Sequence, residues 1–254
     1  MSGAVVDVIG ALALPADTRV ERRVPKKLLL EQGAPTAADK RQIQDGIEEL
    51  IWVAALKPIN IGVPAFRDAV REYLEIAVLT ATLRDNAKAS RVIELIHRAI
   101  PYPVVLVNAQ SDGQSLSLAH KRWSQGEAGA VVIEEVRRTG PLRPDSPAAI
   151  DASFLSSLAL SGLHARDLFA LYQGWIDRVI AVEAAAITGA FAIPETADRA
   201  ATRREALAAH ARLLRDIATM RVQAQRETQM NRRVEINLAI KRLEAELAAT
   251  TLAL

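Results

Sequence analysis

The last part of the chain, residues 196–250, contains neither glycine nor proline. It is dense in Ala, Leu, Arg, Glu and Gln, which are all strong helix formers. Because a helix rises about 1.5 Å per residue, one straight helix here would span roughly 80 Å. The stretch from Gln223 to Arg233 is polar and could interrupt it. The sequence therefore predicts a C-terminal region of long helices with a break near its middle.

A strand–helix–strand unit is predicted earlier in the chain. Residues 73–83 are rich in β-branched side chains, and Glu75 is the only charged residue among them. Residues 86–100 carry apolar side chains at helical spacing, and residues 104–107 form a second apolar run. This order and length are typical of two parallel strands joined by a right-handed crossover helix.

Two further strands and an early helix complete the predicted elements of this part. Residues 115–121 and 130–136 are expected to form an antiparallel hairpin at a sheet edge. Residues 36–57 follow a helical period, with Thr36 as N-cap and Pro58 as terminator, and are predicted to form one helix.

A segment rich in proline and glycine, residues 139–147, is the predicted domain boundary. We expect residues 1–138 to form an α/β (α+β) head with a small mixed sheet flanked by helices. Residues 148–254 are expected to form an all-α tail of long helices, resembling a helical hairpin or coiled coil.

Composition excludes several classes of protein. The chain has no cysteine, which rules out disulfides, thiolate nucleophiles and Cys-ligated metal sites. Its 32 basic and 30 acidic residues leave a net charge of +2, which is unlike a histone-like or ribosomal chain. Apolar runs are too short for a membrane span, and the charges near the N-terminus follow the apolar run, whereas in a secretory signal they precede it. We therefore expect a cytoplasmic protein with no membrane association.

The sequence offers few candidates for catalysis. There is no phosphate-binding glycine loop and no nucleophile elbow, and the four histidines are widely separated, so we expect no metal and no cofactor. Glu72, Glu75 and Glu134 lie on or beside predicted strands, where some nucleases place the carboxylates that hold Mg²⁺. No lysine follows Glu75 at the spacing those nucleases use. A non-enzymatic role is therefore favoured, with a divergent or degenerate nuclease as the alternative.

Two basic clusters are candidates for contacts with nucleic acid, since each phosphate contact adds salt-dependent affinity. The first cluster consists of Arg19, Arg22, Arg23, Lys26 and Lys27. The second contains Arg221, Arg226, Arg232 and Arg233, interleaved with residues that could contact the backbone or bases, Gln223, Gln225, Gln229 and Asn231. The alternative interpretation of both is a solvated surface with ordinary salt bridges.

The final helix carries two further patterns. Asn231, Glu235 and Asn237 are polar positions that we expect to dock the tail on the head. The second pattern has alternating steps of four and three residues, typical of a coiled coil, and could support an antiparallel homodimer. It consists of Ile236, Ile240, Leu243 and Leu247.

Several phrases together resemble a bacterial and archaeal family catalogued as domain of unknown function 4391. They are Val24-Pro-Lys-Lys27, the helix ending in Ile51-Trp52, Ile100-Pro-Tyr-Pro-Val104, and the segment from Gln229 to Asn237. The resemblance carries over no catalytic residue. It implies a setting beside helicases and DNA methyltransferases in restriction-like or phage-defence gene clusters, and hence an accessory or scaffold subunit that binds such a partner and DNA.

Overall fold

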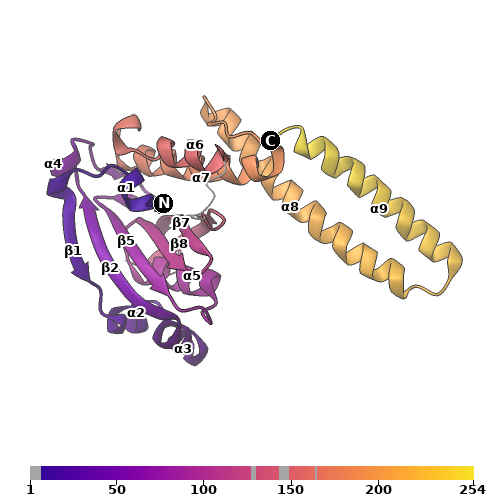
Figure 1. Cartoon of the computed structure of the whole chain (residues 1–254), viewed down its shortest axis with the longest axis horizontal. Coiled ribbons are helices and arrows are strands. Elements are labelled where there is room, and N and C mark those ends of the chain that lie inside the picture. Colours follow the sequence, from indigo (N-terminus) through magenta and orange to yellow (C-terminus); the bar gives the residue numbers. More distant parts are fainter. Residues whose placement is uncertain (1–6, 127–129, 143–148, 164) are drawn as a thin grey trace, which may run out of the picture. The chain divides into compact units, whose positions relative to one another are not determined.

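The computed structural model describes residues 7–126, 130–142, 149–163 and 165–254. The chain divides into two compact units, Met1–Val182 and Glu183–Leu254, here called unit 1 and unit 2. Unit 1 contains the sheet and unit 2 is helical, so the predicted fold class is confirmed (Figure 1).

Unit 1 is built on a six-stranded mixed sheet with the strand order β1-β2-β5-β6-β7-β8. The strands are β1 (Arg19–Arg23), β2 (Ile47–Leu56), β5 (Ile76–Leu83), β6 (Val104–Gln110), β7 (Gly113–Trp123) and β8 (Val131–Arg138). β5 and β6 pair in parallel through helix α5 (Ala89–Ala99), which confirms the predicted crossover unit. β7 and β8 pair antiparallel, and β8 lies at the edge of the sheet. Both features agree with the predicted hairpin.

Helices lie on both faces of this sheet (Figure 1). On one face, α2 (Lys26–Gln32), α3 (Ala37–Gly46) and α5 close a core with β2, β5 and β6. On the other lie α1 (Val8–Ala11), α6 (Ala149–Ser157) and the first turns of α7 (Leu168–Thr188). The smaller elements are η1 (Ala16–Thr18), α4 (Pro58–Ile61), the paired strands β3 (Phe66–Arg67) and β4 (Glu72–Tyr73), and η2 (Leu160–Gly162).

The compact units divide the chain later than the predicted linker does. Residues 143–148 of that region lie outside the described residues, and α6 and most of α7 belong to unit 1. Tyr172 of α7 is fully buried, and its hydroxyl donates to the carbonyl of Val104 at 2.7 Å and accepts from the amide of Ala119 at 2.9 Å. Burial on the sheet therefore decides where this helix belongs.

The prediction of one helix over residues 36–57 is wrong in its second half. Thr36 does cap a helix, accepting from the amide of Asp39 at 3.1 Å, but α3 ends at Gly46 and β2 begins at Ile47. β2 carries two irregularities in its pairing, one after Ile47 and one after Trp52. Each irregularity adds one residue to β2 and shifts the alternation of its side chains between the two faces of the sheet. The buried positions of β2 therefore recur at spacings that resemble those of a helix.

Unit 2 consists of the end of α7 followed by an antiparallel pair of long helices (Figure 1). These are α8 (Ala197–Arg226), capped by Thr196, and α9 (Met230–Thr251). The predicted break is confirmed and falls at residues 227–229. We refer to α8, the turn and α9 as the hairpin.

Candidate nucleic-acid interface

Three residues of the second basic cluster lie at the turn of the hairpin, whereas the fourth, Arg221, lies on α8 and pairs with Glu244 at 2.7 Å. Arg226 is the last residue of α8, and Arg232 and Arg233 lie in the first turn of α9. All three side chains are exposed, and none forms an ion pair with a carboxylate of the described residues. We call these three residues the tip cluster.

One acidic residue, Glu227, lies within the turn itself. Its carboxylate accepts a hydrogen bond from the backbone amide of Gln229 at 2.8 Å, in the link between the two helices. That carboxylate therefore organises the turn. Guanidinium groups held at an exposed turn are suited to phosphate, which they can bind through two parallel hydrogen bonds.

The first basic cluster, on β1 and α2, has a different environment. Arg23 lies 3.9 Å from Glu49, Lys27 lies 3.7 Å from Glu31, and Lys26 donates to the carbonyl of Gln44 at 2.9 Å. Burial lowers the pKa of Lys26, and the positive charges of Arg84 and Arg23 lower it further. Arg84, at the end of β5, was not singled out in the sequence because it lies far along the chain.

Charge on β1 also has a structural explanation. β1 is an edge strand, its pairing with β2 is irregular between Arg19 and Arg22, and Glu21 has a φ of 49°. Charged side chains and bulges are the usual means by which an exposed strand avoids pairing with other chains. Arg19, Arg22 and Arg23 are therefore well explained as protection of this edge.

The three carboxylates of the nuclease hypothesis are separately paired. Glu72 pairs with Arg67, Glu75 with Lys57 at 3.1 Å, and Glu134 with Arg71 at 3.3 Å. Within the described ranges, no three of the His, Asp and Glu side chains are grouped so that they could hold a metal ion. The hypothesis thus finds no metal-binding cluster in this part of the chain.

The apolar pattern of α9 is used inside the hairpin. Ile240 is buried, and Ile236, Leu243 and Leu247 are partly buried on the side that packs against α8. That side is the one on which the homodimer prediction depended, and a helix of the same chain covers it. Of the polar positions predicted to dock the tail, Asn231, Glu235 and Asn237 are all exposed on α9, and their docking stays a prediction.

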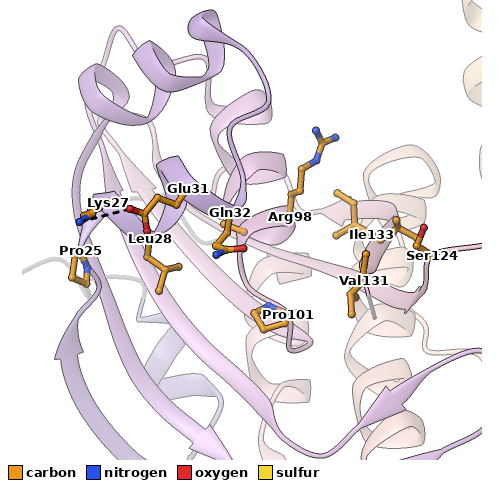
Figure 2. A pocket seen from close by; sticks show the side chains of 13 residues that line it. Pro25, Lys27, Leu28, Glu31, Gln32, Arg98, Pro101, Ser124, Val131 and Ile133 are labelled. Atoms are coloured by element: carbon orange, nitrogen blue, oxygen red, sulfur yellow. Dashed lines mark ion pairs between the residues drawn. The ribbon is translucent and has the colours of Figure 1, made fainter. Parts of the chain in front are cut away.

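Unit 1 carries an open groove of about 1160 Å³ between α2, the end of α5 and the edge strand β8 (Figure 2). Apolar side chains line much of it, including Leu28, which is 41% exposed, and Val131 to Ile133. Its charged groups are paired, Lys27 with Glu31 and Arg98 with Glu94. We call this feature the edge groove, and its composition suits a protein segment better than a charged substrate.

Two buried titratable groups, His97 and Lys121, lie at the end of α5. Lys121 of β7 donates to the carbonyls of His97, at 2.6 Å, and Ile100, where α5 ends. Burial lowers the pKa of Lys121 to about 7 and that of His97 to about 3, with the Lys121 charge adding to the shift of His97. His97 contacts the hydroxyl of Ser117 at 3.1 Å. A side-chain amine that donates to the last carbonyls of a helix stabilises its end, so we assign Lys121 a structural role.

Comparison with known proteins relates the chain to one family. A family model described as "Domain of unknown function (DUF4391)" matches residues 12–247. No curated protein and no solved structure matches the chain. In the parts of the chain described here, no helix combines the length and apolar character needed to cross a membrane.

Proposed function

The chain belongs to the DUF4391 family, and from this premise we propose that it is a non-enzymatic accessory subunit of a DNA-processing assembly. In this proposal the hairpin contacts nucleic acid and unit 1 binds a protein partner. The partner class that the family resemblance implies is a helicase or DNA methyltransferase of a restriction-like or phage-defence system in the cytoplasm.

The observation that carries the nucleic-acid part is the tip cluster. Arg226, Arg232 and Arg233 are exposed and have no acidic partner among the described residues, whereas Arg23 and Lys27 of the first cluster each lie beside a glutamate. Free arginines can release counterions from a phosphate backbone on binding, while paired ones must first give up their partner. Arg19 and Arg22 of the first cluster are likewise exposed and have no ion pair among the described residues, but protection of the edge strand accounts for them, so the tip cluster is the favoured contact.

The edge groove supports the protein-binding part. At one end of it, exposed Leu74 and Tyr102 lie with Trp123 and Val131 around a smaller hollow of about 170 Å³, which Glu72, Lys121 and Arg122 also line. Exposed aromatic and aliphatic side chains around a small hollow are typical of the anchor points of protein interfaces. A partner segment could place one apolar side chain there.

The test is DNA binding by the full chain, measured by fluorescence anisotropy of labelled oligonucleotides between about 50 and 200 mM salt. We expect affinity to fall as salt rises. The variant Arg226→Gln/Arg232→Gln/Arg233→Gln should lower affinity about tenfold or more. The slope of the logarithm of the binding constant against the logarithm of the salt concentration should become shallower, by the amount expected for the loss of about two to three phosphate contacts.

The matched control is Arg19→Gln/Arg22→Gln/Arg23→Gln, which removes the same charge from β1. We expect it to bind within about twofold of the unmodified chain, because small changes in net charge alone have a weak effect at these salt concentrations. Equal losses in the two variants, or no salt-dependent binding by the unmodified chain, would contradict the proposal.

A further inference from the structure

A depression on the hairpin brings together polar side chains from both of its helices. It has a volume of about 380 Å³ and is lined by Arg221, Ala224 and Gln225 of α8 and by Arg233, Asn237 and Ile240 of α9. All of the lining residues belong to unit 2. Only Arg233 among them is part of the tip cluster.

Helical spacing explains why these residues share a face. Arg221 and Gln225 are four residues apart on α8, and Arg233 and Asn237 are four residues apart on α9, so each pair lies on one side of its helix. The antiparallel arrangement sets one guanidinium and one carboxamide on each wall. Ile240, which is 7% exposed, provides an apolar floor between them.

The two arginines of the depression give it a positive charge, and only one of them is paired with a carboxylate. Arg221 donates to the carboxylate of Glu244 at 2.7 Å, which holds its guanidinium beside the depression. Arg233 contacts only the sulfur of Met230, at 3.6 Å, and has no carboxylate partner among the residues described. One guanidinium is therefore positioned by the protein, and the other is available to an anionic ligand.

These groups match the chemistry of a nucleotide unit. Guanidinium groups bind phosphate and can also stack on a base. Carboxamides donate and accept hydrogen bonds at once, as do the edges of bases.

The width of the hairpin distinguishes between forms of nucleic acid. The major groove of duplex DNA is about 12 Å wide and admits one helix, and a helix with its side chains is about 10–12 Å across. Two helices side by side are therefore too wide to enter it. Carboxamides in the depression between α8 and α9 could not reach the base edges of a duplex, whereas the unpaired bases of a single strand can approach them.

We propose that this depression binds single-stranded nucleic acid, with a phosphate on Arg233 and a neighbouring base against Gln225 and Asn237. The inference rests on the proposed function, because it specifies the form of nucleic acid that the hairpin contacts. It also gives a role to Asn237 and Gln225, which the basic clusters alone did not explain.

The test uses the full chain and compares a single-stranded with a duplex oligonucleotide of the same sequence by fluorescence anisotropy. The variant Gln225→Ala/Asn237→Ala removes no charge. We expect it to lower single-strand affinity about tenfold, as loss of one good set of base contacts does, with an unchanged salt slope. Duplex affinity should change by less than about twofold, because the duplex makes only phosphate contacts here.

The control variant Thr202→Ala/Thr219→Ala removes two uncharged polar side chains from exposed positions of α8 outside the depression. It should bind like the unmodified chain, and circular dichroism should show both variants to be equally helical. If the two variants behave alike, or if duplex and single-strand affinities fall together, this inference is overturned while salt-dependent DNA binding still supports the proposed function. Absence of any binding by the unmodified chain would overturn both.

Discussion

Basic side chains have different neighbours in unit 1 and in unit 2. In unit 1, Arg98 and Lys27 at the edge groove lie beside glutamates, and Lys26 donates to a backbone carbonyl. At the hairpin turn, Arg226 and Arg232 have no such partner among the described residues. The comparison shows that the neighbours supplied by each fold decide how many cations of a basic cluster stay available to a ligand.

The cause is the number of neighbours that each architecture supplies. A sheet covered by helices on both faces surrounds each strand with groups from distant parts of the chain, which pair charges and bury polar atoms. Each helix of a two-helix hairpin packs mainly against the other, so most of its surface faces solvent. Exposed Val234 and Leu238 on α9 show the same property for apolar side chains.

The largest difference between the two units should appear in the free energy of unfolding that is lost when a side chain is truncated. Trp175 is fully buried in unit 1, and its indole donates to the carbonyl of Leu158 at 3.0 Å. Trp175→Ala should lower the free energy of unfolding by about 3–5 kcal/mol, because it leaves a cavity and an unpaired carbonyl. Urea denaturation measures this loss. Leu238→Ala, at a position 53% exposed on α9, is the control and should cost less than about 0.5 kcal/mol. Similar losses for the two variants would remove the contrast.

The second prediction concerns acid. The pKa of buried His97 is lowered to about 3, whereas in the unfolded chain it is about 6.5. As pH falls from 6.5 towards 3, the unfolded state binds a proton that the folded state does not, so unit 1 loses stability. Between pH 7 and pH 4.5 this one group should cost about 3 kcal/mol.

The variant His97→Gln keeps a hydrogen-bonding group beside Ser117 and removes the titration. Its free energy of unfolding should therefore fall less steeply with acid than that of the unmodified chain, when both are measured by urea denaturation at several pH values. The difference between the two slopes is the quantity to compare, since other groups such as Asp39, whose pKa is lowered to about 2 by Arg91 and Thr36, are common to both chains. Parallel slopes would show that His97 does not contribute.

A third prediction tests whether the two units unfold separately. Ile240 is the buried residue of α9, so Ile240→Ala should destabilise the hairpin by about 2 kcal/mol. Hydrogen exchange of α8 and α9 amides should become faster, while exchange in β5 and β6 should not change. Faster exchange throughout both units would indicate that they unfold together.

The smallest expected effect on stability belongs to the edge strand. Arg19→Thr/Arg22→Thr/Arg23→Thr should change the free energy of unfolding by less than about 0.5 kcal/mol per residue, because these side chains are exposed. If their role is to protect β1, the variant should nevertheless show more concentration-dependent light scattering. The tip variant Arg226→Gln/Arg232→Gln/Arg233→Gln serves as the control and should not scatter more.

The sequence by itself determined the elements whose signals are local. The parallel pair around α5, the cap at Thr36 and the helical tail with its break near Glu227 follow from periodicity, capping chemistry and helix propensity, which neighbouring residues establish. The same reasoning failed for residues 47–56, because the irregularities in β2 exist only through its pairing with β5.

Tertiary structure alone decided which candidate residues could act together. Glu49, Gln44 and Arg84 reach the first cluster from other elements, and burial on the sheet placed most of α7 in unit 1. Arg221 and Asn237 line one depression only because the hairpin folds back on itself. Helix and strand formation depend on nearest neighbours, but charge pairing, burial and the assembly of a site depend on residues that the chain brings together from far apart.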